Sequence, residues 1–226
     1  MGLLSLAIWI PIAFGVLLLA LGNDRHAGVV RATALIGAIV SFLVTLPLIS
    51  GFDKRSAALQ FVEKQPWIDR FNVFYHLGVD GLSVWFVLLT AFITVIVVIS
   101  AWQVITDRVA QYMGAFLILS GLMVGVFCAA DGLLFYVFFE ATLIPMYLII
   151  GMWGGARRVY AAFKFFLYTF AGSLLMLVAL IYLYFKSGGS FDIQTWHKLP
   201  LPMPAQALLF FAFFAAFSVK VPMWPV

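Results

Sequence analysis

Two ionisable side chains lie inside long apolar stretches, where charge is energetically expensive. Glu140 lies within the apolar run 133–152, and Lys220 lies within the apolar run 205–226. Charged side chains in the interior of a bilayer are rare, face protein or water, and usually mark an ion or proton path. Because Glu140 and Lys220 have opposite charges, we predict that they form a working pair that captures and releases protons.

The chemistry of such a pair follows from its surroundings. Burial favours the neutral amine of a lysine, whereas a nearby carboxylate favours the ammonium, so opening and closing the pair can move a proton. At 1.5 Å per residue, Lys220 lies about 21 Å beyond residue 206 and Glu140 about 10 Å beyond residue 133. The two depths differ, and a direct contact therefore needs long side chains, a shifted helix boundary or a bridging water. We expect this switch to need neither a metal ion nor an organic cofactor.

For each of these charged residues, a purely structural role is an alternative to a role in proton transfer. Glu140 could be a protonated acid that hydrogen-bonds to a neighbouring helix, and Lys220 could reach the membrane surface if it lies near a helix end. Lys164, at the start of the apolar run 161–185, is a weaker candidate for the proton path. For Lys164, a basic anchor at the cytoplasmic interface explains the residue equally well.

Two prolines follow the candidate pair and should interrupt its helices. Pro145 has no N–H with which to bond the carbonyl of Ala141, so a free carbonyl next to Glu140 is a natural seat for water. Pro222 should break the helix just after Lys220, as in the discontinuous helices of transporter ion sites. On a helical wheel, four residues share the face of Glu140: Tyr136, Ile144, Tyr147 and Gly151.

The composition assigns the chain to the membrane proteins. Of its 226 residues, 65% are hydrophobic and 10% are charged, and the net charge is +4. Soluble domains are closer to half apolar and a quarter charged. Cys128 is the single cysteine, which excludes a disulfide framework. We expect neither a catalytic nor a metal site, because the three histidines lie in connections, where we expect them to be solvated: His26, His76 and His197.

The elements that carry these residues are predicted from length and hydropathy. A helix needs about 20 apolar residues to cross the hydrocarbon core. We therefore predict an all-α polytopic fold, a single transmembrane domain over residues 1–226. Seven spans are expected: 3–21, 32–49, 82–104, 113–130, 133–152, 161–185 and 205–226.

The connections set the expected orientation. Alternate connections are short and rich in arginine, namely 22–31, 105–112 and 153–160. By the positive-inside rule these lie in the cytoplasm, which places the N-terminus on the outer side. The connection 50–81 mixes aromatic and charged residues, and a surface-lying helix or a hairpin on the outer side fits it. We expect Asp80 to cap the following helix and Asp131 to act as a turn and cap residue.

A stripe of small residues runs along the fourth predicted span. Gly121, Gly125 and Ala129 recur every four residues. Small residues at this spacing allow two helices to approach closely. We assign the stripe to packing.

Three stretches make the sequence resemble a known family. They are Leu77-Gly78-Val79-Asp80-Gly81-Leu82-Ser83, the stretch from Phe139-Glu140-Ala141-Thr142-Leu143-Ile144-Pro145-Met146-Tyr147-Leu148 to Trp153-Gly154, and Ala216-Phe217-Ser218-Val219-Lys220-Val221-Pro222-Met223-Trp224-Pro225. On these residues the chain resembles subunit M of the proton-pumping NADH:quinone oxidoreductases (respiratory complex I), the bacterial counterpart of mitochondrial chain 4. The resemblance covers the whole chain as roughly the N-terminal half of a family member, so we expect an N-terminal fragment.

The resemblance implies a fold and a site. The family fold has 14 helices in two inverted repeats, each with a broken helix, and residues 112–226 match most of the first repeat, incomplete at its C-terminus. Glu140 matches the acid of the fifth helix, Lys220 matches the pumping lysine of the broken seventh helix, and Lys164 is a weaker match. The implied location is the bacterial plasma membrane.

The resemblance also implies partners. Antiporter-like and other membrane subunits are expected beside this chain. NADH, flavin, iron–sulfur clusters and quinone are expected on other subunits, with no redox site on this chain.

Three functions are therefore open. The first is a proton-translocating subunit of the oxidoreductase, driven by redox chemistry elsewhere in the complex. The second is a subunit of a multi-subunit cation/proton antiporter, and the third is a structural or assembly fragment without an ion path. The context Pro145-Met146-Tyr147 favours the first.

Overall fold

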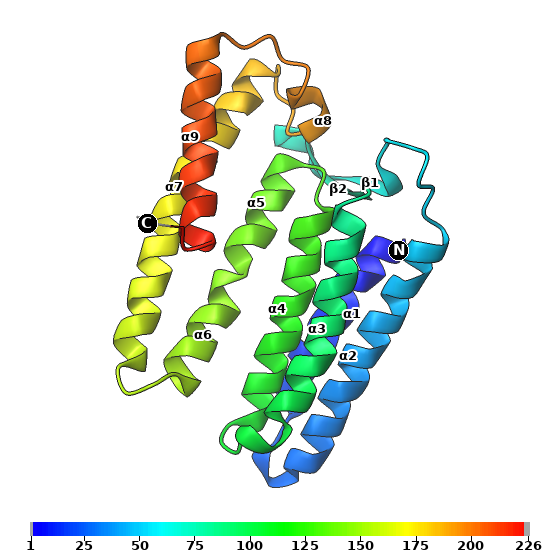
Figure 1. Ribbon diagram of the computed structural model, residues 1–226, viewed down its shortest axis with the longest axis vertical. Coiled ribbons are helices and arrows are strands. Elements are labelled where there is room, and N and C mark those ends of the chain that lie inside the picture. The colour runs from blue at the N-terminus through cyan, green and yellow to red at the C-terminus, as the bar shows by residue number, and fades with distance from the viewer. Residues whose placement is uncertain (1, 224–226) are drawn as a thin grey trace. The chain divides into compact units, whose positions relative to one another are not determined.

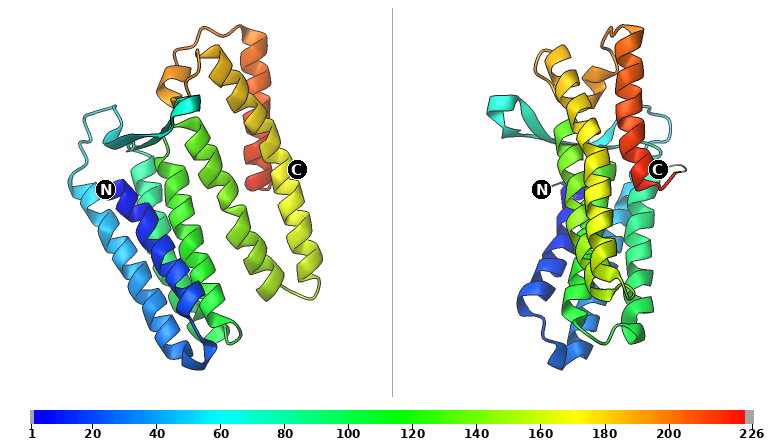
Figure 2. Two further views of the ribbon diagram at one scale, coloured as in Figure 1. Left: turned by 180° about the vertical axis from the view of Figure 1, so that it is seen from behind. Right: turned by 90° about the vertical axis from the view of Figure 1, so that its left-hand side faces the viewer.

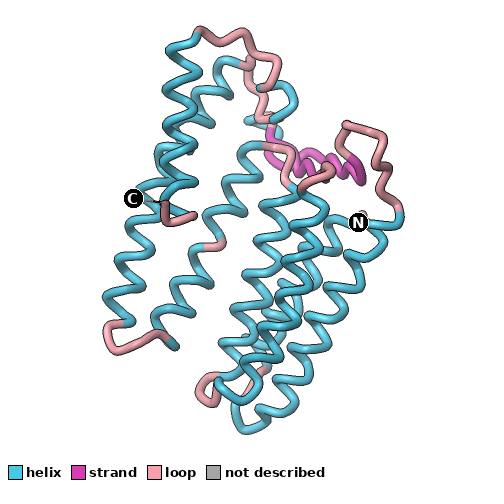
Figure 3. The backbone as a smooth tube through the Cα atoms, viewed as in Figure 1, coloured by secondary structure: helices cyan, strands magenta, loops and turns pink. Residues whose placement is uncertain are grey.

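The computed structural model describes residues 2–223 and separates into two compact units. The first unit comprises Met1–Lys64 and His76–Ala129, and the second comprises Gln65–Tyr75 and Ala130–Val226. Figures 1 and 2 follow the chain from blue to red, and Figure 3 marks helices, strands and loops. Each unit is described separately below.

Four long helices build the first unit. They are α1 (Leu3–Leu21), α2 (Ala27–Ser50), α3 (Ser83–Val104) and α4 (Val109–Cys128), with the short 3₁₀ turn η1 (Asp24–His26) between α1 and α2. Apolar side chains cover every face of these helices, because helices in lipid need no polar stripe toward water. Helix α1 packs against α4 and α2, and α3 packs against α2 and α4.

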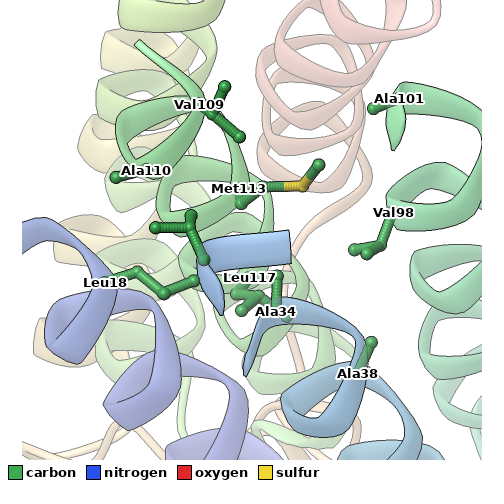
Figure 4. Close-up of a cluster of buried hydrophobic side chains, with 10 residues drawn as sticks. Leu18, Ala34, Ala38, Val98, Ala101, Val109, Ala110, Met113 and Leu117 are labelled. Carbon is green, nitrogen blue, oxygen red and sulfur yellow. The ribbon is translucent and has the colours of Figure 1, made fainter. Parts of the chain in front are cut away.

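Small residues allow these helices to pack tightly. Figure 4 shows the buried cluster that α1, α2, α3 and α4 share, formed by Leu18, Val30, Ala34, Ala38, Val98, Ala101, Val109, Ala110, Met113 and Leu117. A Cβ atom on Gly15 would lie 2.7 Å from the Gly114 carbonyl oxygen, and one on Gly121 would lie 2.5 Å from the Ile8 carbonyl oxygen. The predicted packing role is thus confirmed at Gly121, which brings α4 against the backbone of α1.

The long connection folds as a β-hairpin rather than as a surface helix. Strand β1 (Gln60–Ile68) pairs with β2 (Val73–Val79), and the 3₁₀ turn η2 (Asp69–Phe71) joins them. Asn72 completes the turn in the left-handed region at φ 52°. At the base of the hairpin, the Glu63 carboxylate accepts hydrogen bonds from the backbone N–H groups of Gly2, Leu4 and Ser5 and from the Ser5 hydroxyl.

The capping role predicted for Asp80 is confirmed, whereas one histidine differs from expectation. Asp80 Oδ1 accepts from the N–H groups of Leu82 and Ser83 at 3.0 and 2.7 Å, where α3 begins. His26 and His197 are exposed as expected. His76 is buried, with 7% of its surface exposed, so the expectation of a solvated side chain was wrong. It lies in β2, whose last four residues are all buried.

Five helices build the described part of the second unit. They are α5 (Gly132–Ala141), α6 (Leu143–Trp153), α7 (Arg158–Lys186), the short α8 (Ile193–Trp196) and α9 (Met203–Lys220). Helices α5 and α6 form one span that is interrupted at Thr142, visible as a short loop in Figure 3. Helix α7 packs along α6 and along α9.

A turn fixes the start of α5, as predicted for Asp131. Its carboxylate, 1% exposed, accepts from the N–H groups of Leu133 and Leu134 and also from that of Phe74 in β2. The backbone of Asp131 pairs with that of Asp192, which precedes α8. The connection before α9 is thereby held against the start of α5.

Seven helical segments of the described chain are long and apolar enough to cross a membrane. They confirm the seven predicted spans, with boundaries that shift by up to eight residues, the largest shift being at the start of the second segment, Asp24–Ser50. The last helix ends at Lys220, and a turn follows at Val221 and Pro222 where the predicted break begins. The remainder of that predicted span, 224–226, lies outside the described residues.

Candidate functional site

The end of α9 places Lys220 deep within the second unit. Figures 1 and 2 show α9 running along α7 and ending near its middle. At this level a Cβ atom on Gly172 would lie 3.1 Å from Val219, so the two helices are close. Gly172 is the central residue of α7, about 21 Å from its first residue at 1.5 Å per residue. Lys220 therefore lies at mid-depth and not at a helix end near the membrane surface.

Aromatic contacts hold α9 against α5. The Phe217 ring packs edge-on against Phe135 and Phe139, with centroids 6.4 and 6.1 Å apart and planes at 77° and 78°. Edge-to-face pairs of this kind add to the stabilisation from buried area. Because Phe217 lies three residues before Lys220, these contacts direct the end of α9 toward the end of α5.

Lys220 forms hydrogen bonds with residues at the junction between α5 and α6. Its Nζ donates to Thr142 Oγ1 at 3.1 Å and to the Phe139 carbonyl oxygen at 3.5 Å. The same nitrogen lies 4.3 Å from the centroid of the Phe139 ring. The Thr142 hydroxyl in turn donates to the Phe139 carbonyl at 2.7 Å. We call Thr142 and Phe139 together the lysine cradle.

Sequence reasoning missed both members of the lysine cradle. Thr142 lies two residues after Glu140 and three before Pro145, directly after the Ala141 carbonyl that Pro145 cannot reach. The available signal was a hydroxyl residue beside a proline-interrupted helix, where side-chain hydroxyls commonly satisfy freed carbonyls in membranes.

Glu140 lies beside a different set of groups. The Ser173 hydroxyl of α7 lies beside both the Glu140 carboxyl and the Tyr136 phenol. Glu140 and Lys220 interact electrostatically. Within residues 2–223, however, no ion pair shorter than 4.0 Å joins them, and Glu140 Oε1 is buried without a hydrogen-bond partner. The pair is therefore adjacent but open.

The predicted face of Glu140 is only partly preserved. Tyr136 is buried and near the carboxyl through Ser173, as the helical wheel suggests. Tyr147 instead packs edge-on against Phe163 and Phe166 of α7, and Ile144 is exposed. The wheel describes one helix alone, whereas the position of the Tyr147 ring is set by its packing against α7.

A cavity of about 960 Å³ brings Lys164 and Lys220 to one surface. It lies between the end of α9 and the α6–α7 turn, and Arg157 and Arg158 from that turn also line it. Among the described residues that line it, none is acidic. The cavity thus connects the mid-depth lysine with the basic end of the unit, and Lys164 lies along the way.

Comparison with known proteins gives the family context. Residues 129–226 match the family described as "NADH:quinone oxidoreductase/Mrp antiporter, TM". Over 99% of its length, the chain is 49% identical to NADH-quinone oxidoreductase subunit M of Rhodobacter capsulatus and 42% identical to NADH-ubiquinone oxidoreductase chain 4 of Arabidopsis thaliana. The predicted resemblance to subunit M is confirmed. The chain spans 46% and 45% of these two relatives.

Solved structures agree on the fold. A chain of respiratory complex I from Thermus thermophilus with bound NADH matches with a TM-score of 0.85 and 34% identity, over 98% of this chain and 44% of that one. A chain of the Mrp complex from Dietzia sp. DQ12-45-1b matches with a TM-score of 0.75 and 18% identity, over 96% of this chain and 23% of that one. At that identity the second match shows the fold alone. The antiporter-like helical fold predicted for the chain is confirmed.

Proposed function

We propose that this chain forms part of a proton-translocating membrane subunit of an NADH:quinone oxidoreductase. The observation that carries the proposal is the position of Lys220. A basic residue is held at mid-depth beside the helix that carries an acid, within the segment that matches the family. In the proposed reaction Glu140 and Lys220 exchange protons across the membrane interior.

The proposed mechanism has two states of the pair. The proposed open state has Lys220 bound by Thr142 and Phe139, with Glu140 beside Ser173. In the closed state the ammonium pairs with the Glu140 carboxylate. Closing favours the charged form of both groups, so Glu140 releases its proton, and opening favours the neutral acid, so Glu140 takes up a proton again. Lys164 would then pass protons along the basic cavity that it shares with Lys220.

The energy for this cycle comes, in the proposal, from redox chemistry on other subunits. NADH, flavin, iron–sulfur clusters and quinone would be held there, and antiporter-like membrane subunits would neighbour this chain. The complex would lie in the bacterial plasma membrane with the N-terminus on the outer side. The likeness to the Mrp complex carries information on the fold only, and nothing specific favours cation exchange.

The test uses the full-length protein in the assembled complex. Glu140→Gln and Lys220→Met keep the side-chain size and remove the titrating group, and Lys186→Met removes an exposed lysine from the far end of α7. NADH-driven proton uptake in membrane vesicles, NADH oxidation and assembly on native gels are measured for each. We expect the first two variants to assemble and lose pumping while Lys186→Met retains it. Full pumping in Glu140→Gln or in Lys220→Met would refute the proposal.

A further inference from the structure

Building on the proposed function, we propose that Thr142 is a positioning residue which holds Lys220 away from Glu140. It does so with Phe139, its partner in the lysine cradle. The cradle makes the open pair a stable state, so that closing the pair requires the ammonium to leave defined contacts.

The hydroxyl of Thr142 is oriented to accept from lysine. A threonine hydroxyl has one hydrogen to donate and two lone pairs to accept with. Its hydrogen is used on the Phe139 carbonyl at 2.7 Å, and the lone pairs are therefore left for the Lys220 nitrogen at 3.1 Å. With 9% of its surface exposed, Thr142 gives water little access to compete for these lone pairs.

The number of acceptors around Lys220 Nζ equals the number of N–H donors of a lysine ammonium. A lysine ammonium has three N–H donors and no acceptor. The cradle offers three acceptors: Thr142 Oγ1, the Phe139 carbonyl oxygen and the face of the Phe139 ring, whose centroid lies 4.3 Å from Nζ. Attraction to a ring face requires a cation and strengthens when water is excluded. The geometry thus suits the charged form of Lys220 without any carboxylate.

Helical geometry places the cradle and the carboxyl on different faces of α5. At about 100° per residue, Phe139 lies roughly 100° and Thr142 roughly 160° to one side of Glu140. Glu140 lies beside Ser173 on α7, whereas the cradle faces the end of α9. The ammonium cannot keep the cradle contacts and form a close pair with Glu140, so the two positions are alternatives.

Removal of the hydroxyl should favour the closed pair. A hydrogen bond to a charged group is worth roughly a tenfold or larger change in an equilibrium constant. In Thr142→Val, which keeps the shape, the equilibrium between the open and closed pair should therefore shift about tenfold toward the closed pair, and NADH-driven pumping should fall by about tenfold because the pair reopens less often. In Thr142→Ser the hydroxyl is kept, and pumping should stay near that of the unmodified complex.

A spectroscopic readout separates positioning from a structural role. An acid without a cation partner in the bilayer interior is held neutral, and a paired acid ionises. The infrared C=O stretching band of protonated Glu140 is identified by its disappearance in Glu140→Gln. We expect this band to weaken in Thr142→Val and to persist in Thr142→Ser. The matched control is Thr45→Val, another buried threonine whose hydroxyl donates to a backbone carbonyl, that of Phe42 at 2.6 Å.

The Thr142 variants test the lysine cradle, and Lys220→Met tests the proposed function, so failure of one can be distinguished from failure of the other. If Thr142→Val pumps and absorbs like the unmodified complex while Lys220→Met does not pump, the cradle is refuted and the function stands. If Thr142→Val and Thr142→Ser lose pumping equally with the band unchanged, Thr142 has only a structural role and the inference is refuted. If Lys220→Met pumps normally, the function itself fails.

Discussion

Asp131 controls the first turn of the helix that carries Glu140, and its removal should open that turn. The carboxylate accepts three backbone hydrogen bonds, from Leu133 at 3.0 Å, Leu134 at 3.1 Å and Phe74 at 3.2 Å. Loss of an N-terminal cap costs about 1 kcal/mol. Loss of the charged acceptor for the Phe74 N–H adds about 2 kcal/mol, since the group is buried. Asp131→Ala should therefore destabilise this region by about 3 kcal/mol.

Hydrogen–deuterium exchange in the assembled complex measures this effect directly. A cost of about 3 kcal/mol speeds exchange through local opening by roughly 100-fold for peptides that cover the start of α5. Asp131→Asn keeps one carbonyl oxygen and should give a smaller increase. The matched control is Asp192→Ala, because Asp192 caps the four-residue helix α8 through a single bond to Gln194 at 3.0 Å. For that variant we expect about tenfold faster exchange, confined to α8.

The comparison between Asp131→Ala and Asp192→Ala tests whether Asp131 stabilises only the start of α5. If Asp131→Ala opens α5 no more than Asp192→Ala opens α8, the three bonds do not act together, and burial of the carboxylate contributes nothing. Faster exchange throughout the second unit would instead mean that Asp131 stabilises the whole unit. Either result would refute the local capping argument.

Three further predictions concern residues at or before the first turns of helices. A methyl group on Gly132 would overlap the Trp196 ring, so Gly132→Ala should lower stability by about 1–3 kcal/mol in thermal unfolding, whereas Gly28→Ala, with open space around it, should not. Glu63→Ala removes the acceptor for three N–H groups at the start of α1, and exchange of that first turn should rise at least tenfold if the carboxylate is its cap. The backbone N–H of Ser83 lowers the pKa of Asp80 in the folded chain. Its capping is therefore complete at neutral pH and is lost only as the pH falls through that lowered pKa. If exchange in α3 were the same for the unmodified chain and for Asp80→Ala at pH 6, this capping role would be contradicted.

The spans were predictable because the bilayer fixes both their length and their composition. The first span was placed at both ends, at Leu3 and Leu21, since polar residues and a glycine bound the apolar run. The hairpin was only one of two alternatives, because aromatic residues at the membrane surface suit a helix and a strand equally. The burial of His76 depends on the packing of β2, which periodicity of this short strand does not reveal.

The candidate site could be predicted only for residues whose type alone is unusual within an apolar helix. Glu140 and Lys220 are conspicuous because charged residues are rare in apolar runs. Pro145 predicts a break in the hydrogen bonding of its helix, because proline has no N–H to donate. The contacts of Thr142 depend on how α9 packs against the junction of α5 and α6, which a wheel of one helix does not describe. The wheel also does not describe the packing of α7, whose Phe163 and Phe166 contact the Tyr147 ring.

The interrupted helices explain how an ammonium can rest at mid-depth without a carboxylate. The carbonyls in the last turn of a helix lack intrahelical partners, and in lipid they must find others. Phe139 lies in the last turn of α5, and its carbonyl is satisfied by Thr142 and Lys220. Helix α9 ends at Lys220 itself, which brings the side chain to this point. Because the Thr142 hydroxyl and the Phe139 carbonyl supply these contacts, Lys220 has a defined position apart from Glu140. The proposed switched pair requires such a second position.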